Sequence, residues 1–355
     1  MKIAQIAPLA ESVPPRLYGG SERIVSYLTE ELVRQGHDVT LFASSDSVTS
    51  AKLIGCSPTA LRLSTEVFDA LPWHLVMLER VRQRAGQFDI LHFHIDLLQF
   101  PLLRSIGTPS VTTLHGRQDL PDLPAFYRAF PDVPLVSISD AQRTPLPPVN
   151  WAATIHHGLP RDLYTFQPHP AGYLLFLGRI SPEKRPDRAI EIAMRAGMPL
   201  KIAAKVDKVD EEYWLTKIQP LVQGNRLVDF VGEVGDADKD ALLGGASAVL
   251  FPIDWPEPFG LVMIEAMACG TPVIAFPCGS VPAVLEDGVA GFLVTNVEEA
   301  AAAVERISEL DRARIRATFE RRFDIARVAE DYVAVYHALR GAAQTPRRAV
   351  LPLTA

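Results

Sequence analysis

The sequence predicts an α/β protein made of two doubly wound lobes, each built on a parallel sheet. Its 355 residues suit two domains at roughly 150 residues each. Short apolar runs of strand length alternate with segments of helix length along the chain. The runs are apolar throughout rather than at every second residue, which indicates strands buried on both faces, as in a parallel sheet covered by helices.

Five apolar runs in the first half of the chain are expected to be strands. They cover residues 2–7, 38–43, 89–94, 109–114 and 134–139. Between the first two, residues 21–35 have helix length and are followed by Gly36, the residue type that commonly ends a helix. Strand and helix alternate, and we place a first Rossmann-like domain at residues 1–160.

The pattern starts again after a stretch that contains Pro168 and Pro170 and few aliphatic residues, so residues 161–171 are expected to be a linker. A second α/β domain is expected at residues 172–324. Its strands are expected at residues 173–177, 200–203, 227–231, 248–252 and 272–275. Helices are expected near the C-terminus at residues 300–310 and 325–339.

The composition excludes several classes of protein. A formal net charge of −7 provides no broad positive field, so no nucleic-acid partner is expected. Three cysteines without paired spacing indicate neither a disulfide framework nor a zinc site. The N-terminus shows no secretory signal, and no apolar run approaches the roughly 20 residues of a membrane span. We expect a cytoplasmic protein with at most peripheral membrane contact.

The most informative motif is FPIDWPEPFGLVMIEAMACGTPVIA at residues 251–275, in which seven residues separate Glu257 from Glu265. A helix is expected over residues 261–269, and its free N-terminal amides and dipole suit a ligand phosphate. Glu265, one turn into this helix, can accept two hydrogen bonds from a vicinal diol such as a ribose. Glu257 is expected at the sugar end of such a ligand.

A second motif, GRISPEK, ends a predicted strand at residues 178–184. Arg179 offers phosphate oxygens a planar fork of donors, and Lys184 offers a movable positive charge. Both suit a departing diphosphate. Together they would take the place of a divalent cation, so no metal and no cofactor are expected.

A third motif, Gly19-Gly20, lies between the first predicted strand and the first predicted helix, where glycines let the backbone approach a ligand closely. The loop lacks the Gly-x-Gly-x-x-Gly turn of dinucleotide-binding domains, and no acidic residue ends the second strand. These differences count against a nicotinamide-dependent oxidoreductase.

The motif at residues 251–275 resembles the retaining glycosyltransferases of family 4, also described as glycosyl transferases group 1. Their hallmark is two glutamates separated by seven residues and followed by an Ala-Met-Ala-x-Gly-x-Pro-Val-Ile-Ala run. The resemblance implies a GT-B fold, in which two Rossmann-like lobes face a cleft. The first lobe then binds the acceptor and the second binds the nucleotide-sugar donor, while the C-terminal helix at about residues 325–340 packs back on the first lobe.

The resemblance also implies roles for the residues of this motif. Glu265 would bind the nucleotide ribose. Glu257 and the backbone amides after it would contact the transferred sugar and the diphosphate. The residues that carry those amides are Phe259, Gly260 and Leu261.

Residues outside this motif match other positions of the family. Arg179 and Lys184 match its cationic pair. Gly19 and Gly20 belong to the loop that faces the diphosphate across the cleft, and His115 matches the histidine that touches the transferred sugar.

Two further histidines, His92 and His94, precede His115 at the end of a neighbouring strand. Two histidines separated by one residue on a strand point to the same side, so both could bind one metal ion. A metal site is therefore an alternative interpretation. No carboxylate trio or cysteine pair accompanies it, so metal binding is disfavoured. Asp96 and Ser139 also lie at strand ends and are candidates for contact with an acceptor.

The function implied by the resemblance is the metal-independent transfer of a hexosyl group, with retention, from a UDP- or GDP-linked donor to an unidentified acceptor. A nucleotide-sugar 2-epimerase and a non-catalytic nucleotide-sugar binding protein remain alternatives. The acceptor is a saccharide, a lipid-linked glycan or a small metabolite. Residues 75–84 combine aliphatic residues with three arginines, so contact with anionic lipid is a weaker alternative to a solvated helix face.

Overall fold

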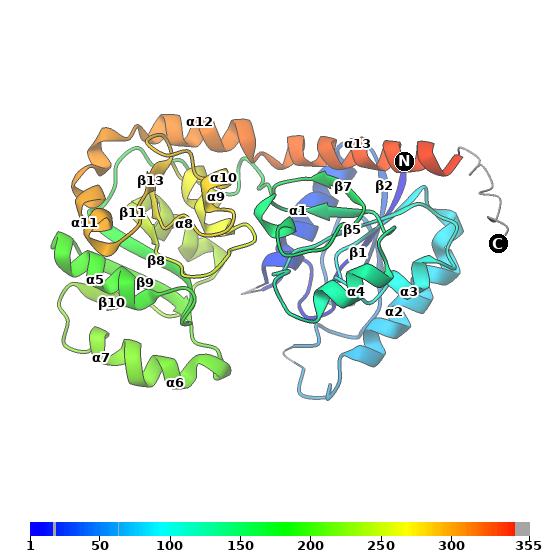
Figure 1. Cartoon of the computed structure of the whole chain (residues 1–355), viewed down its shortest axis with the longest axis horizontal. Coiled ribbons are helices and arrows are strands. Elements are labelled where there is room, and N and C mark those ends of the chain that lie inside the picture. The colour runs from blue at the N-terminus through cyan, green and yellow to red at the C-terminus, as the bar shows by residue number, and fades with distance from the viewer. Residues whose placement is uncertain (17–18, 63, 345–355) are drawn as a thin grey trace, which may run out of the picture.

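The computed structural model describes residues 1–16, 19–62 and 64–344, and these residues form two lobes that lie side by side (Figure 1). The N-terminal lobe holds a seven-stranded sheet and the C-terminal lobe a six-stranded sheet. All strand pairs recorded in the two sheets are parallel. The predicted class, two doubly wound α/β lobes, is therefore confirmed.

The N-terminal sheet has the strand order β3-β2-β1-β4-β5-β6-β7. Its strands are β1 (Lys2–Ile6), β2 (Asp38–Ala43), β3 (Lys52–Gly55), β4 (Ile90–Phe93), β5 (Ser110–Thr113), β6 (Leu135–Ser137) and β7 (Trp151–Thr154). The edge strands β3 and β7 were not predicted, because both are largely half-buried and lack a continuous apolar run. The helices of this lobe are α1 (Gly20–Arg34), α2 (Leu71–Arg84), α3 (Phe100–Leu103) and α4 (Leu123–Ala129).

The C-terminal sheet has the order β10-β9-β8-β11-β12-β13. Its strands are β8 (Tyr173–Arg179), β9 (Leu200–Lys205), β10 (Val228–Phe230), β11 (Ala246–Phe251), β12 (Val273–Ala275) and β13 (Gly291–Leu293). The first helices of this lobe are α5 (Pro186–Ala196), α6 (Glu211–Tyr213), α7 (Gln219–Val222), α8 (Asp236–Gly245), α9 (Leu261–Ala268) and α10 (Val281–Val284). The predictions omitted β13, an edge strand whose Gly-Phe-Leu sequence gives no apolar run.

Three helices complete the described chain: α11 (Val297–Glu305), α12 (Arg312–Arg322) and α13 (Ile325–Gln344). The helix predicted at residues 300–310 begins earlier, because the Asn296 side chain caps it by accepting from the Glu299 amide at 2.8 Å. The arginine-rich α12 was not predicted, since it buries few residues besides Ile315 and Phe319 and shows a weak apolar stripe.

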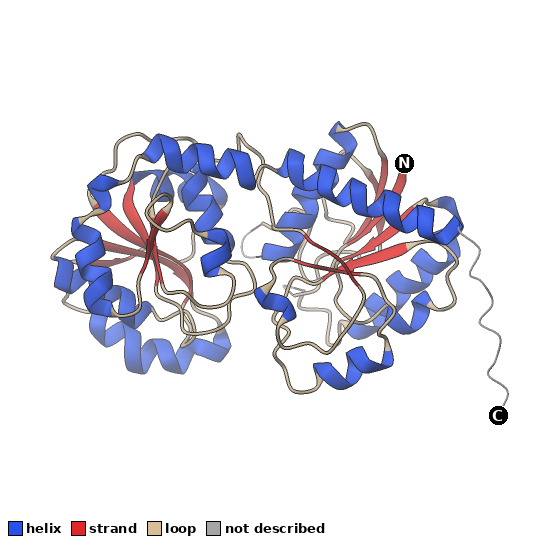
Figure 2. Ribbon diagram, turned by 45° about the horizontal axis from the view of Figure 1, so that its top comes forward, coloured by secondary structure: helices blue, strands red, loops and turns tan. Residues whose placement is uncertain are grey.

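Helices cover both faces of each sheet, as Figure 2 shows. The long helix α13 leaves the C-terminal lobe and lies along the N-terminal lobe (Figure 1). There Val328, Ala329 and Tyr332 join a buried cluster with Ile3 and Leu28 of that lobe. The end of the chain thus supplies part of the core of its first domain.

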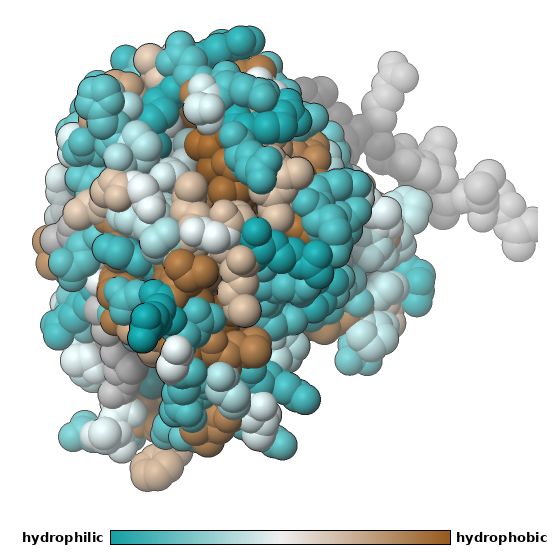
Figure 3. All heavy atoms as spheres, turned by 90° about the vertical axis from the view of Figure 1, so that its left-hand side faces the viewer, coloured by the Kyte–Doolittle hydropathy of each residue, from teal (hydrophilic) through white to brown (hydrophobic). Residues whose placement is uncertain are grey.

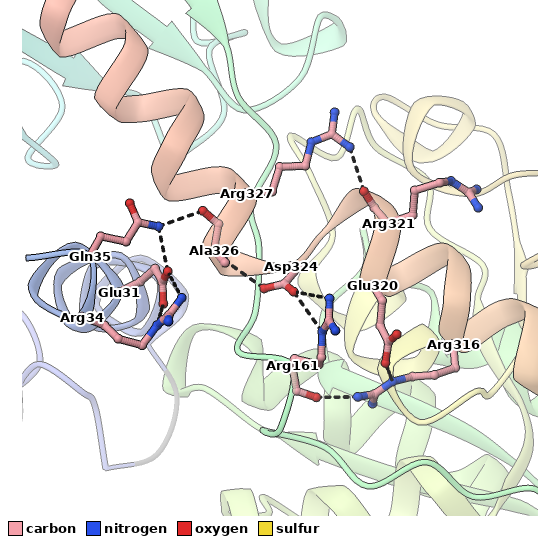
Figure 4. A network of polar contacts seen from close by, with 10 residues as sticks. All are labelled: Glu31, Arg34, Gln35, Arg161, Arg316, Glu320, Arg321, Asp324, Ala326 and Arg327. Atoms are coloured by element: carbon pink, nitrogen blue, oxygen red, sulfur yellow. Dashed lines mark hydrogen bonds and ion pairs between the residues drawn. The ribbon is translucent and has the colours of Figure 1, made fainter.

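The passage from α12 to α13 is bonded to the start of the linker. The Leu159 amide donates to the Phe323 carbonyl at 2.9 Å, and the Ile325 amide donates to the Leu159 carbonyl at 3.0 Å. Asp324 lies between them; one of its carboxylate oxygens accepts from the Ala326 amide at 3.0 Å, and the other accepts from Arg161 Nε at 3.0 Å (Figure 4). Asp324 therefore both caps α13 and holds the linker.

Neighbouring side chains strengthen this junction. Arg316 of α12 donates to the backbone carbonyls of Arg161 and Tyr164 in the linker. Gln35, at the end of α1, donates to the Ala326 carbonyl at 3.1 Å (Figure 4). The linker, α12 and the N-terminal lobe consequently share one polar network.

The outer face of the C-terminal lobe mixes hydrophilic and apolar residues (Figure 3). Exposed apolar residues of this lobe include Met194, Val209 and Leu215. Individually exposed apolar residues are ordinary on protein surfaces. In the described part of the chain, no helix is both long enough and apolar enough to cross a membrane.

Replacing Asp324 with alanine should lower the free energy of unfolding by roughly 1–2 kcal/mol, because it removes a helix cap and an ion pair. Asp311→Ala is the matched control, since Asp311 caps α12 through the Ala313 amide at 2.9 Å. We expect about 1 kcal/mol for that change. Urea unfolding of both variants measures the difference, and an equal loss would show that the bond to Arg161 contributes nothing.

Candidate active site

A cavity of about 460 Å³ opens between the lobes and is lined by residues of both. All ten residues predicted for the site line it: Gly19, Gly20, His115, Arg179, Lys184, Glu257, Phe259, Gly260, Leu261 and Glu265. Tyr18, which precedes the glycine pair, lies outside the described residues. The fold therefore brings together residues that are spread over almost 250 positions of the sequence.

The carboxyl ends of the C-terminal strands supply much of the second wall. Arg179, Lys205 and Phe251 are the last residues of β8, β9 and β11, and all three line the cavity. The strand order reverses beside β8, since β9 pairs on one side of it and β11 on the other. Ligands of open parallel sheets bind at such a switch point.

The start of α9 depends on Gly260, whose φ of +82° lies in the left-handed region. A Cβ atom at this position would lie 2.7 Å from Met263 Cε and 3.2 Å from the Phe251 ring. Glycine is therefore required both for its conformation and for space. It lets α9 begin at the cavity wall, where the first amides of the helix have no partner within the helix.

Glu265, in the second turn of α9, is buried with 3% of its surface exposed. Its Oε1 pairs with the Lys239 ammonium of α8 and accepts from the Tyr164 hydroxyl at 3.3 Å. The sequence predictions did not include Lys239, because nothing local marks a lysine of one helix as the partner of a glutamate in another. The ion pair keeps a buried carboxylate compensated.

Lys184 and Glu257 form a second ion pair across the C-terminal wall. The Trp255 indole Nε1 donates to the same Glu257 oxygen at 3.0 Å, and the Lys184 ammonium lies 4.8 Å from the centre of the Trp255 ring. Both predicted residues thus contact Trp255, which, like Glu257, follows β11, whereas Lys184 follows β8.

Arg179 lies among three carboxylates. It pairs with Glu183, and its guanidinium lies 3.4 Å from Asp210 and 3.9 Å from Asp207. Burial would raise the pKa of Glu183, but backbone hydrogen bonds and the bond from Arg179 outweigh it and lower that pKa. Burial raises the pKa of Asp210 against the pull of Arg179. Arg179, which was predicted to bind phosphate, therefore already has acidic partners. The sequence prediction did not include these carboxylates.

His115 lines the wall of the cavity that the N-terminal lobe forms. It follows β5, and its ring is stacked on the His157 ring with centres 5.2 Å apart and planes 17° apart. Burial lowers the pKa of His115 to about 4, so the ring is neutral at physiological pH. His157 was not predicted; it lies near the linker, where sequence alone gives no sign that it reaches a strand end.

His92 and His94 hold protein partners at both ring nitrogens. His92 bonds to the Tyr336 hydroxyl at 2.8 Å and to Thr113 Oγ1 at 2.7 Å. His94 bonds to Gln5 Oε1 at 2.7 Å and to His115 Nε2 at 2.8 Å. Within the described ranges no group of three or more His, Cys, Asp or Glu residues is arranged to hold a metal ion.

The loop before α1 faces α9 across the cavity. A Cβ on Gly20 would lie 3.5 Å from Leu261 Cδ1 of the opposite lobe. Glu22, in the first turn of α1, is buried, which raises its pKa, and it accepts from the Glu11 amide at 3.2 Å. Glu11 in turn pairs with Arg62 at 2.5 Å. These three charged residues line the cavity and were missed, although Glu22 lies only two residues after the glycine motif.

Asp96 and Ser139, the candidates for contact with an acceptor, are not among the residues that line the cavity. The Ser139 hydroxyl donates instead to the Pro258 carbonyl of the other lobe at 2.7 Å. Asp96 is exposed and held at a left-handed φ of 54°, and the His115 amide donates to it. Both side chains serve contacts within the protein.

The arginines at residues 75–84 differ in their surroundings, since Arg82 is exposed and pairs with an exposed glutamate of the same helix. Arg80 donates to the Gly55 carbonyl, and Arg82 donates to Glu79 at 2.7 Å. Leu75 and Val76 of the same helix are exposed. The exposed pair fits the solvated helix face, and contact with anionic lipid stays the weaker, untested alternative.

Two family models match the chain over adjoining ranges. The model described as "Glycosyltransferase Family 4" matches residues 18–176, and that described as "Glycosyl transferases group 1" matches residues 166–322. The chain is a group 1, family 4 glycosyltransferase. Each lobe of this glycosyltransferase corresponds to one of the two models.

Similar proteins include other transferases. The glycosyltransferase is 28% identical to a phosphatidyl-myo-inositol mannosyltransferase of Mycobacterium leprae, over 96% of this chain and 97% of the relative. It is 27% identical to a glycogen synthase of Mycobacterium tuberculosis, over 94% and 95% of the two chains.

Solved structures share the fold of this glycosyltransferase. AviGT4, a glycosyltransferase involved in avilamycin A biosynthesis, has a TM-score of 0.71 and 24% identity over 96% of this chain and 98% of its own. Anabaena HepE, solved in complex with UDP, has a TM-score of 0.72 and 18% identity over 95% of this chain and 100% of its own. The predicted two-lobed GT-B fold is confirmed.

The buried histidines of the glycosyltransferase should make its stability depend on pH. Burial lowers the pKa values of His92, His94, His115 and His157, so all four are neutral in the folded protein. The unfolded chain takes up their protons as pH falls through about 6.5, so stability decreases from there toward pH 4. Each histidine contributes a slope of up to about 1.4 kcal/mol per pH unit.

Urea unfolding at pH 7.5, 6.5 and 5.5 measures this slope. The His157→Gln variant should show a smaller slope, because one proton fewer is taken up on unfolding. Equal stability of the unmodified protein at the three pH values would contradict the assignment of neutral histidines.

Proposed function

We propose that this glycosyltransferase moves a hexosyl group from a UDP- or GDP-linked donor to a saccharide acceptor, with retention at the anomeric carbon and without a metal ion. The observation that carries the proposal is the convergence of Arg179, Lys184 and the amide end of α9 on one wall of the cavity. Two cations and a helix N-terminus on one wall suit the binding of a single diphosphate.

The diphosphate binds by exchanging partners. Arg179 leaves part of its contact with Glu183 and Asp210, and Lys184 leaves Glu257, for phosphate oxygens. The negative charge that grows on the leaving phosphate is then met by cations already placed in the cavity. In this proposal they carry the role that a divalent cation has in other transferases.

The nucleoside binds on the α8 side of the same wall. The recorded contacts of Lys239 and Tyr164 both engage Glu265 Oε1, and we assign Oε2 to the ribose hydroxyls. A carboxylate accepts both hydroxyls of a vicinal diol. Lys239 remains beside the carboxylate and compensates its charge.

The acceptor approaches along the N-terminal wall, where Glu22, Glu11 and Arg62 lie. Carboxylate and guanidinium groups match the hydroxyls of a saccharide. No carboxylate is assigned as the nucleophile, because Glu257 is assigned to contact with the transferred sugar and stays bonded to the Trp255 indole after Lys184 leaves it. We therefore assign the acceptor proton to the leaving phosphate, with the acceptor oxygen attacking from the same face.

The alternatives differ in what they release. A nucleotide-sugar 2-epimerase would act without an acceptor, whereas the relatives named above are transferases or synthases. A non-catalytic binding protein would hold the donor intact. A release assay in EDTA separates these cases: the purified protein is given UDP-glucose, UDP-galactose, UDP-N-acetylglucosamine, GDP-mannose and ADP-glucose separately, and free nucleoside diphosphate is measured.

In that assay one UDP or GDP donor should yield nucleoside diphosphate at the same rate with and without EDTA, and Glu265→Ala should abolish the release. Release that requires an added divalent cation would contradict metal independence. Binding of a donor without release, even with mono- and disaccharide acceptors present, would favour the binding protein.

Lys184→Ala should lower turnover by about 100-fold while affinity for the intact nucleotide-sugar donor falls less than tenfold, because the charge that the lysine meets develops only as the diphosphate leaves. Steady-state kinetics and calorimetry with the intact donor measure the two effects. Lys217→Ala is the matched control, since Lys217 is exposed on the same lobe and does not line the cavity. Equal losses of turnover and affinity in Lys184→Ala would rule out this role.

A further inference from the structure

A chain of hydrogen bonds joins the C-terminal helix α13 to His115. Gln5 Nε2 of β1 donates to the Tyr336 hydroxyl at 3.2 Å, and Gln5 Oε1 faces His94 Nε2 at 2.7 Å. His94 Nδ1 lies 2.8 Å from His115 Nε2. Each of these side chains is buried or lies against the cavity.

The direction of the first bond determines all the others. Because the Gln5 amide nitrogen is used on Tyr336, its oxygen faces His94, whose Nε2 must then carry a proton. His94 Nδ1 is left as an acceptor and receives the proton of His115 Nε2. A neutral imidazole carries one proton, so His115 Nδ1 has none and can only accept.

His115 Nδ1 has no hydrogen-bond partner among the described residues, although it is buried. The ring lines the cavity, and its stacking on His157 fixes its plane. A buried acceptor without a partner is unfavourable unless a ligand supplies the donor. The candidate donors are the hydroxyls of the sugar that the proposed function places here.

We propose that Tyr336 is a positioning residue which, through Gln5 and His94, keeps His115 as a hydrogen-bond acceptor for a hydroxyl of the donor hexosyl group. The chemical role of the ligand hydroxyl rests on the proposed function, whereas the state of the ring does not. Tyr336 itself touches no substrate. It acts from the end of the chain on a residue of the first lobe, because α13 packs on β1 and β4.

The helix offers a matched control. Tyr332 lies one turn before Tyr336, is equally buried, and bonds to Thr113 Oγ1 at 3.0 Å. Among the described residues, Tyr332 has no hydrogen bond to Gln5 and is connected to Tyr336 by hydrogen bonds only through Thr113 and His92. Tyr332→Phe and Tyr336→Phe therefore each delete one buried hydroxyl from the same helix, and only the second removes the partner of Gln5.

The test is the ¹⁵N spectrum of the histidine side chains in the full, ligand-free chain, with the His115 signals identified by their loss in His115→Gln. The unmodified protein and Tyr332→Phe should show His115 protonated at Nε2 and bare at Nδ1. Tyr336→Phe should show a mixture with the opposite tautomer. A proton on Nδ1 in the unmodified protein overturns the proposal, and that spectrum decides it even when a variant does not fold.

Kinetics give the second readout. With the donor found in the release assay, kcat/KM should fall about tenfold in Tyr336→Phe, as expected for loss of one hydrogen bond, and less than twofold in Tyr332→Phe. Gln5→Met breaks the same link and should match Tyr336→Phe. An unchanged tautomer and unchanged kcat/KM in Tyr336→Phe would overturn its role. If the spectra are as expected but the protein turns over no donor, the positioning role is supported and the proposed function is contradicted.

Discussion

Two backbone hydrogen bonds between Leu159 and the segment Phe323–Ile325 hold the point where the chain returns to its first lobe. The linker begins beside them, and α12 and α13 meet there, with Asp324 bonded to both sides (Figure 4). This junction sets the position of one lobe against the other. The cavity depends on it, because Gly20 of one wall and Leu261 of the other are close enough that a single methyl group would bring them into contact.

The electrostatics of the cavity follow from the same enclosure. Charges removed from water must be compensated, and the C-terminal wall keeps Lys184 with Glu257 and Lys239 with Glu265. These ion pairs hold the two lysine ammonium groups in the cavity in the absence of a ligand. A diphosphate then replaces one set of anionic oxygens by another, which costs less than bringing positive charge in from solvent during the reaction. The paired state of the free protein is in this account the preparation for donor binding.

Local motifs could be predicted from the sequence, and contacts between distant segments could not. Glu257 and Glu265 lie in one strand, loop and helix unit, so the helix start between them and the family resemblance predicted one shared site, and both line the cavity. Lys239 contacts Glu265, and Tyr336 is linked to His115, only because helices distant in the sequence pack together. No local sequence pattern indicates either role. The bond from Ser139 to the Pro258 carbonyl could not be predicted for the same reason, because the two residues belong to different lobes. The edge strands β3 and β7 were likewise not predicted, because their strand conformation depends more on pairing with the neighbouring strand than on their own residues.

The most direct test of the account is a crystal structure of the protein with UDP or GDP, whichever binds, in the presence of EDTA. The account predicts the β-phosphate between Arg179, Lys184 and the first amides of α9, and both ribose hydroxyls on Glu265. Lys184 should then have left Glu257 for the phosphate. A diphosphate bound elsewhere in the cavity, with the Lys184–Glu257 pair intact, would contradict the exchange of partners on which the proposed function rests.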